Sequence, residues 1–506
     1  MLNGMRRFYN AVSPRNVGRS ANDPCFGRIV LLAIAVITFV RIVLLILTPL
    51  QLYPDEAQYW WWAQEPAFGY FSKPPLIAWL IWLSTALFGN SEWAIRLGSP
   101  LLHAATAILV FGIARRLFDA RLGFWSALAY LTTPGVSYSS GMMSTDVPLL
   151  FFWALALYAL TRTLDDSRWR WVLLCGIAFG LGLESKYAMF YFVVCAVAAA
   201  LGSRRARTVV FGGRGLAILL IGLLLLLPNF LWNAVRQFPT VMHTETNADW
   251  NHARYSLVEL GSFVGGQFGV FGPALMAALL LGLWKLARAP ERTEGSLILA
   301  AFCVPPLVII LIQSFVSRAN ANWAATAYVA ATPLAVGVLL DLWRDRALWV
   351  SFILNGLAMT VLWTILAWPP FADEIGLGDA FKRLRGWHEL GTAVASVASR
   401  GHYDVIAVAN RSVMAELLYY AQPRTAAMRM WDVGLHDDNQ FKMTLRLTRP
   451  ARRVLLVVEP TEAPAVLRTF RVTKPVMIVS FPIAPRQVRV AELSDGRDYL
   501  GPQTHP

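Results

Sequence analysis

The chain has 506 residues, of which 56% are hydrophobic and only 15% are charged. That balance is too apolar for a soluble protein of this length and predicts a chain that crosses a membrane several times. The net charge of +14 does not indicate nucleic-acid binding, because lysine and arginine fall in short clusters between apolar runs and not on one basic face.

The first predicted span follows a basic N-terminal tail, residues 1–27. The apolar run that starts at Ile29 and ends at Leu50 is too long for a cleaved signal peptide, so we expect it to remain as a span. Because a helix needs about 20 residues to cross the hydrocarbon core, the apolar runs over residues 28–369 predict about eleven spans. They lie near residues 28–49, 94–114, 122–143, 147–163, 171–185, 187–202, 215–235, 260–286, 296–316, 323–340 and 347–367.

The basic clusters between these spans predict the orientation. Clusters such as 115–121, 204–214 and 285–292 all fall on the side of the N-terminus, which the positive-inside rule makes cytoplasmic. Nearly every isolated charge then falls on the opposite face. These charges include Asp55, Lys73, Asp146, Lys186, His243 and Arg318.

A long first loop, residues 50–93, carries the densest group of polar and aromatic residues on that face. Tyrosine and tryptophan settle at the membrane interface, so the adjacent acids Asp55 and Glu56 should lie at headgroup depth. The alternative is an ordinary solvated loop, but charges beside a bilayer are usually functional. The segment 74–88 is short, apolar and opens with two prolines, which predicts a helix lying in the interface.

The two acids in this loop predict acid–base chemistry. Adjacent carboxylates point in different directions, so one can face a substrate while the other is held by its neighbours. A carboxylate beside a low-dielectric region is a better general base near neutral pH, and its natural task is to take a proton from an acceptor hydroxyl. Asp55 and Glu56 are therefore the catalytic candidates, and Tyr59 and Tyr70 are candidates for contacting the substrate.

Isolated cations on the same face predict a phosphate site. Lys73 and Lys186 are point charges that could stabilise a phosphate leaving group, and Arg318 could add a bidentate contact. Each could instead be an anchor that snorkels at a helix end. Asp146 precedes Pro148 at the start of a span, where it could cap the helix or contact substrate.

The segment 237–252 contains two histidines, His243 and His252, and two acids, which could in principle bind a divalent ion. The spacing matches no closed metal site, and we expect a solvated loop in which His243 contacts phosphate. No metal site is assigned, although a divalent metal requirement stays open.

The composition changes at residue 370, where charge rises and short β-type runs appear near 404–409, 453–458 and 488–493, with a helical stretch over 413–421. This alternation predicts a small α/β domain over residues 370–506. With an odd number of spans it lies on the same face as the isolated charges, where it could cover the site or bind the acceptor.

Several ordered motifs resemble those of the GT-C glycosyltransferases of the protein mannosyltransferase and aminoarabinose transferase superfamily. The resemblance covers about residues 28–340. The matching stretches are Pro54-Asp55-Glu56-Ala57-Gln58-Tyr59-Trp60, Gly69-Tyr70-Phe71-Ser72-Lys73-Pro74-Pro75, Ser144-Thr145-Asp146-Val147-Pro148, Ser185-Lys186-Tyr187, Pro228-Asn229-Phe230-Leu231-Trp232-Asn233 and Asn320-Ala321-Asn322-Trp323.

The resemblance implies a multi-pass enzyme of the bacterial inner membrane that moves a sugar from a polyprenyl-phosphate donor, with inversion, on the periplasmic face. It implies that Asp55 is the catalytic acid/base, with Glu56 beside it, and that Lys73 meets the donor phosphate. Its partners would be the lipid-linked sugar, lipopolysaccharide or lipid A as acceptor, and membrane lipid, without nucleic acid.

One residue departs from the aminoarabinose transferases, which have glutamate where this chain has Ser72. The change speaks against a metal site at Ser72 and His243 and against aminoarabinose as the sugar. The Ser-Lys-Pro-Pro form resembles bacterial relatives that decorate the lipopolysaccharide core or lipid A with other sugars, including uronic acids.

Three other functions compete with this interpretation. A protein O-glycosyltransferase of the same superfamily would share the motifs. A transporter or flippase for a lipid-linked sugar would place charges at the bilayer midplane and repeat one half of the chain in the other, and neither pattern is present. A structural or sensing protein would not explain why the ionisable residues collect on one face.

Overall fold

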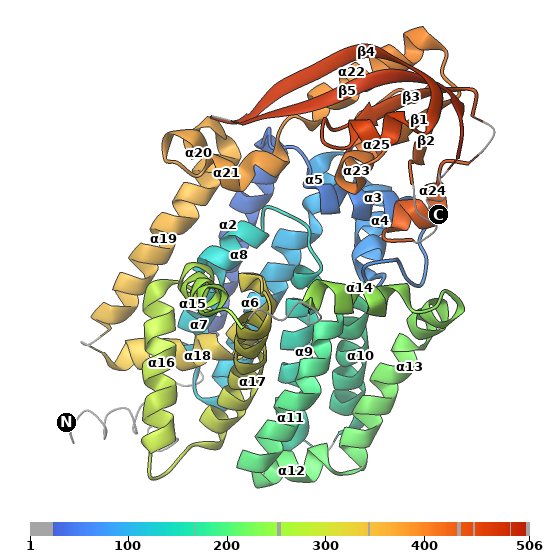
Figure 1. Ribbon diagram of the computed structural model, residues 1–506. Helices are drawn as coiled ribbons and strands as arrows, with labels where there is room; N and C mark the ends of the chain where they lie inside the picture. The colour runs from blue at the N-terminus through green and yellow to red at the C-terminus, as the bar shows by residue number, and fades with distance from the viewer. Residues whose placement is uncertain are drawn as a thin grey trace. The chain divides into compact units, whose positions relative to one another are not determined.

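A computed structural model describes residues 24–166, 168–249, 255–342, 345–432, 437–448, 451–485 and 487–501 (Figure 1). The expected N-terminal tail therefore lies outside the described residues up to position 23. The chain divides into two compact units. One comprises Met1–Ile46, Lys73–Ile77 and Arg96–Trp363, and the other comprises Leu47–Ser72, Ala78–Ile95 and Thr364–Pro506.

The first unit is a bundle of helices, because its long apolar runs can satisfy their backbone polar groups internally only as helices. Its main elements are α2 (Pro24–Leu47), α6 (Gly98–Leu117), α7 (Ala120–Thr132), α8 (Pro134–Ser139), α9 (Asp146–Asp165), α10 (Trp169–Ser185), η3 (Tyr187–Phe190), α11 (Tyr191–Gly202), α12 (Arg204–Val210), α13 (Gly213–Val235), α14 (Pro239–Ala248), α15 (Leu257–Phe271), α16 (Pro273–Arg288), α17 (Glu294–Val316), η5 (Ala321–Ala324), α18 (Ala327–Asp341) and α19 (Arg346–Ala367).

Within the described residues, six helices are long and apolar enough to cross a membrane, or seven if one bent pair counts as a span. The six are Phe26–Leu47, Glu92–Leu117, Asp146–Asp165, Gly213–Val235, Glu294–Val316 and Arg346–Ala367. Shorter apolar helices are Leu76–Phe88, Tyr187–Gly202 and Ala327–Asp341. The chain is thus a multi-pass membrane protein.

Two expected spans are interrupted. The segment 260–286 forms α15 and α16, which meet at 109°. Gly272 at the break has φ +94°, a left-handed conformation that favours glycine, and Pro273 starts the next helix without a backbone N–H. The segment 122–143 breaks at Thr133, whose extended backbone is the conformation that a following proline favours.

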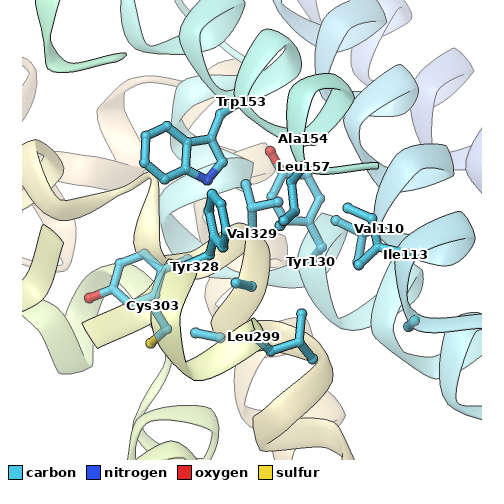
Figure 2. Close-up of a cluster of buried hydrophobic side chains, with 14 of the residues drawn as sticks. Val110, Ile113, Tyr130, Trp153, Ala154, Leu157, Leu299, Cys303, Tyr328 and Val329 are labelled. Carbon is cyan, nitrogen blue, oxygen red and sulfur yellow. The ribbon is translucent and has the colours of Figure 1, made fainter. Parts of the chain in front are cut away.

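The core of this unit lies where α6, α7, α9, α17 and α18 converge. Figure 2 shows Trp153 of α9, Tyr328 of α18, and Leu299 and Cys303 of α17 in one cluster of buried side chains. Trp153 is fully buried and packs edge-on against Phe302, with ring centroids 6.2 Å apart. Elsewhere in the unit α10 and α13 pack closely, since a Cβ added at Gly180 would lie 2.7 Å from Leu225.

The second unit combines the first loop with the C-terminal region. Its elements are α3 (Pro54–Gln64), most of α4 (Leu76–Phe88) and α5 (Glu92–Arg96), then α20 (Pro370–Glu374), α21 (Gly378–Phe381), η6 (Lys382–Leu384), α22 (Trp387–Gly401), β1 (Val405–Val408), α23 (Arg411–Tyr420), β2 (Ala427–Met430), α24 (Gln440–Leu445), β3 (Arg453–Val458), α25 (Ala463–Leu467), β4 (Phe470–Ala484) and β5 (Gln487–Tyr499).

The described strands form one sheet in the order β2-β1-β3-β5-β4 (Figure 1). β1 pairs in parallel with both β2 and β3, with Val405 opposite Ala427 and Val454, whereas β5 is antiparallel to β3 and β4. The three expected β-type runs fall in β1, β3 and β5, and the expected helix over 413–421 is α23. The small C-terminal sheet is therefore confirmed.

The first loop packs against α23 within this unit. Trp60 of α3 meets Tyr419 edge-on at 4.9 Å, and its indole N–H donates to Asn90 Oδ1 at 2.8 Å. The backbone N–H of Leu52 donates to the hydroxyl of Tyr420 at 2.8 Å, and that hydroxyl donates to Glu92. Burial raises the pKa of Tyr420, which keeps its phenol neutral and able to donate.

Candidate active site

The first loop places its two acids at the start of α3. Pro54 occupies the first helical turn, where its missing N–H costs nothing, and the acids follow it near the positive end of the helix dipole. Glu56 is 2% exposed and its carboxylate accepts a hydrogen bond from the backbone N–H of Tyr53 at 2.9 Å. Glu56 thus caps the helix, while Asp55 stays half-exposed.

An arginine from the C-terminal region holds Asp55. Arg411 Nη1 donates to Asp55 Oδ1 at 3.0 Å and to the side-chain oxygen of Gln58 at 2.7 Å. The side chains of Arg411 and Asp55 are 39% and 42% exposed, so water and a substrate can reach the pair. Among the residues that the structure describes, Asp55 Oδ2 makes no hydrogen bond, which leaves one carboxylate oxygen free to accept a proton.

Helix α23 places Arg411 at this position. The side chain of Asn410 accepts hydrogen bonds from the backbone N–H groups of Ser412 and Val413, so α23 begins at Arg411. Neither Arg411 nor Gln58 was predicted from the sequence. A signal was present in the sequence: a capping asparagine followed by an arginine, directly after a β-type run. Side chains at the carboxyl ends of parallel strands often line ligand-binding sites.

The other unit contains a second polar cluster, around Asp146 at the first residue of α9. Lys186 Nζ lies 2.7 Å from Asp146 Oδ1, and Asn322 Nδ2 of η5 donates to Asp146 Oδ2 at 2.7 Å. The side chains of Lys186 and Asp146 are only 21% and 12% exposed. Both oxygens of Asp146 are engaged, so this carboxylate positions its neighbours and is a poor candidate for a general base.

The residues after Lys186 are fixed by a hydrogen-bonded group on α13. The hydroxyl of Tyr187 donates to Asn229 Oδ1 at 2.6 Å, and the side chain of Asn233 accepts from the backbone N–H of Thr240 at 3.2 Å. Thr240 lies at the start of α14, so this group joins the end of α10 to α13 and α14. The motif residues 185–187 and 228–233 therefore meet in space.

The expectation of a solvated loop around His243 was wrong about the loop in its described part, although Val241, Met242 and residues 244–246 are exposed to solvent. Residues 239–248 form the helix α14, which Pro239 can start because proline fits the first helical position. His243 is half-buried, and its Nε2 lies 2.9 Å from Asn247 Nδ2, one helical turn later. His252 lies outside the described residues. In the described part of the chain no group of three or more His, Cys, Asp or Glu could hold a metal ion.

The remaining candidates lie in different settings. Lys73 is half-buried between Ser72 and Pro74, and Arg318 is exposed just after α17. Tyr59 and Tyr70 are buried, at 4% and 3% exposure. The Tyr70 ring stacks on the Trp62 ring, with the ring centroids 4.4 Å apart.

The hydroxyl of Tyr70 organises its own loop. It donates to the backbone oxygen of Trp62 at 3.0 Å and accepts from the backbone N–H of Ala67 at 3.0 Å. Burial raises the pKa of Tyr70 to about 12, which keeps this phenol neutral. These contacts favour a role in shaping the loop over direct contact with substrate.

Long apolar helices, a carboxylate at the start of the first-loop helix and a small C-terminal sheet agree with the class expected from the sequence, the GT-C membrane glycosyltransferases, and comparisons with known proteins test that class. The profile described as dolichyl-phosphate-mannose-protein mannosyltransferase matches residues 72–232. The lipid A galacturonosyltransferase RgtD of Rhizobium johnstonii is 34% identical over 458 residues, covering 88% of this chain and 94% of that protein.

Two further comparisons agree. An undecaprenyl phosphate-alpha-4-amino-4-deoxy-L-arabinose arabinosyl transferase of Pseudomonas fluorescens is 33% identical over 178 residues, 33% of this chain and 32% of that protein. The structure of ArnT from Cupriavidus metallidurans bound to undecaprenyl phosphate aligns with a TM-score of 0.63 at 18% identity, covering 93% of this chain and 98% of that one. The chain belongs to the GT-C glycosyltransferases of the protein mannosyltransferase and aminoarabinose (lipid A) transferase superfamily and is a glycosyltransferase.

Proposed function

We propose that this glycosyltransferase moves a uronic acid, of the galacturonate type, from a polyprenyl phosphate to lipid A or the lipopolysaccharide core. The similarity to a lipid A galacturonosyltransferase over nearly the whole chain supports this choice of sugar and acceptor. Ser72, in place of the glutamate of aminoarabinose transferases, supports a sugar other than aminoarabinose. The observation that carries the mechanism is the half-exposed Asp55, with one oxygen held by Arg411 and the other open.

The reaction is a single inverting displacement. Asp55 Oδ2 takes the proton of an acceptor hydroxyl as that oxygen forms a bond with the anomeric carbon of the donor sugar. The bond between the anomeric carbon and the phosphate oxygen breaks, and the electron pair leaves with the polyprenyl phosphate. Arg411, itself bound to Gln58, keeps the carboxylate in place before the substrate arrives, which lowers the orientational cost of the reaction.

The phosphate that leaves carries additional negative charge, and we assign Lys73 to stabilise it. Lys186 can contribute as well, because an ammonium group has three donors and only one is directed at Asp146. His243 and Arg318 are assigned as further donor-phosphate contacts, and Asp146 acts on substrate through the position of Lys186.

We place this site on the periplasmic face of the bacterial inner membrane, with the N-terminus in the cytoplasm and about eleven spans in all. The distribution of basic clusters supports the orientation. The six long apolar helices and the bent pair are segments that suit seven of these crossings.

The full-length protein in nanodiscs tests the proposal, with a synthetic polyprenyl-phosphate galacturonate as donor and lipid A as acceptor. Mass spectrometry should find one added uronic acid per acceptor. Asp55→Asn should lower kcat by about 10²–10⁴-fold, the range that a general base contributes. The matched control is Glu65→Gln, which removes an exposed acid at the end of the same helix and should leave kcat unchanged.

Full activity of Asp55→Asn would contradict the mechanism. Mass spectrometry of lipopolysaccharide and glycoproteins from cells with and without the protein then identifies the acceptor. Loss of the sugar from glycoproteins alone would favour a protein O-glycosyltransferase, and accumulation of the lipid-linked sugar on one leaflet without transfer would favour a flippase.

A further inference from the structure

A cavity lies in the same unit as Asp55, near the C-terminal end of α3. It has a volume of about 490 Å³ and is open to solvent. Its walls come from α3, α23, the segment before β2, β2 itself and α24. The lining residues include Trp61, Leu418, Arg424, Met428, Arg429 and Leu445.

Two arginines give this cavity its charge. The guanidinium of Arg424 lies over the ring of Trp61, 5.4 Å from its centroid, and Arg429 Nη1 donates to the backbone oxygen of Met428 at 2.9 Å. Among the described residues neither arginine forms an ion pair with a carboxylate. Partial burial also lowers the pKa of Arg424, the direction expected when a cation loses water without gaining an anion.

The rest of the wall is apolar. Leu418, Met428 and Leu445 line it, and the Trp61 indole supplies a flat aromatic face. Flat aromatic and aliphatic surfaces pack against the C–H faces of sugar rings, while guanidinium groups bind carboxylate or phosphate in bidentate geometry. A cavity that combines these features matches a sugar ring that bears an anionic group.

The position of the cavity connects it with the reaction. Trp61 and Asp55 lie on the same helix, separated by about 9 Å along its axis at 1.5 Å per residue. Six residues also turn the helix by about 240°, so the connection runs through the neighbouring helix α23. Arg411 of α23 binds Asp55, and Leu418, seven residues later on the same face of α23, lines the cavity.

We propose that the cavity lined by Trp61, Arg424 and Arg429 is a binding site for an anionic pyranose of the glycolipid substrate. This inference relies on the proposed transfer to an acidic glycolipid for the choice of ligand. Two sources share the chemistry: a phosphorylated glucosamine, as in lipid A, and a uronic acid.

The test measures binding without turnover, by saturation-transfer difference NMR on the full-length protein in nanodiscs. The probes are glucosamine 1-phosphate, galacturonate and, as the neutral control, galactose. We expect at least one acidic sugar to bind and galactose to give no comparable signal. Arg424→Gln and Arg429→Gln should each lower the affinity for the acidic sugar by about tenfold, because each removes one charge-assisted contact.

Two more variants separate binding in the cavity from a change in folding or surface charge. Ala426→Trp should fill the cavity and abolish binding while both arginines remain. Arg468→Gln removes an exposed arginine of the same unit outside the cavity and should bind like the wild type. A thermal unfolding curve for each variant confirms that it is folded.

The proposal is overturned if neither acidic sugar binds or if galactose binds equally well. It is also overturned if Arg424→Gln, Arg429→Gln and Ala426→Trp bind the acidic sugar like the wild type. Binding of only the phosphate or only the carboxylate sugar supports it and names the source. Asp55→Asn should bind these probes normally, so a failure of the transfer mechanism and a failure of this site give different results.

Discussion

Asp55 and Glu56 are neighbours in sequence with different environments. Glu56 is buried and bound to the backbone at the start of α3, whereas Asp55 is half-exposed and shares Arg411 with Gln58. A guanidinium bound to one carboxylate oxygen fixes the direction of the other. The chemistry that we assign to Asp55 therefore depends on a residue 356 positions later in the chain.

Replacement of Arg411 tests this dependence. Arg411→Gln should lower kcat by about 10–100-fold, since a small misplacement of a catalytic group can cost about two orders of magnitude, while KM for the donor changes little. Arg411→Lys should restore part of kcat, because an ammonium can still contact Asp55. Steady-state transfer kinetics in nanodiscs provide the measurement.

Arg400→Gln, at an exposed position on α22, is the matched control and should leave both constants unchanged. A fall in kcat that accompanies a lower unfolding temperature would instead assign Arg411 a purely structural role. Equal kcat for the glutamine and lysine variants would also contradict a positioning role that depends on charge.

At the scale of elements, the ends of helices bring the motif residues together. Asp146 begins α9, Lys186 follows α10 and Asn322 lies in η5, and the three meet at hydrogen-bonding distance. α10 packs closely on α13, and Tyr187, the residue after Lys186, donates a hydrogen bond to Asn229 of α13. The sequence left Asp146 as a possible helix cap and Lys186 as a possible interfacial anchor, and in the structure the two form an ion pair.

A double-mutant cycle measures this pair. Asp146→Asn and Lys186→Met should each destabilise the protein by about 2 kcal/mol, below the roughly 3–5 kcal/mol for breaking a fully buried pair, because both side chains keep some contact with water. The double variant should cost less than the sum of the single variants, since neither charge is then left unpaired. Equilibrium unfolding in detergent gives the free energies, and additive effects would show that the charges are not coupled.

At the scale of the whole molecule, the chain combines a helical unit, which contains long apolar helices, with a unit that contains the sheet and the catalytic candidate Asp55. Most of the first loop, except Lys73–Ile77, belongs to the second unit, where Trp60 and Leu52 contact α23. A loop that is far from the C-terminal region in sequence thus folds together with it. This arrangement requires that both lie on the same side of the membrane.

The orientation gives a direct prediction. In a background in which Cys25, Cys175, Cys195 and Cys303 are replaced, Phe68→Cys should react with a membrane-impermeant maleimide from the periplasmic side, because Phe68 is 56% exposed. Arg204→Cys, in a basic cluster, should react only after the inner membrane is opened. The opposite pattern would place Asp55 in the cytosol and remove the proposed access to a periplasmic donor.

The sequence by itself determined the multi-pass character, the superfamily, the C-terminal α/β region and the first-loop carboxylates as candidates. These properties are encoded locally, in the length of apolar runs, the alternation of β-type residues and short motifs such as Pro54-Asp55-Glu56. The roles of the individual site residues stay predictions.

Only the tertiary structure decided which residues meet. In the structure Asp55 contacts Arg411, and Asp146 contacts Lys186 and Asn322. Glu56 is buried while Asp55 is half-exposed, and the segment 260–286 is bent at Gly272. No local pattern encodes these outcomes, because side chains from distant segments become neighbours only when the helices and the sheet pack.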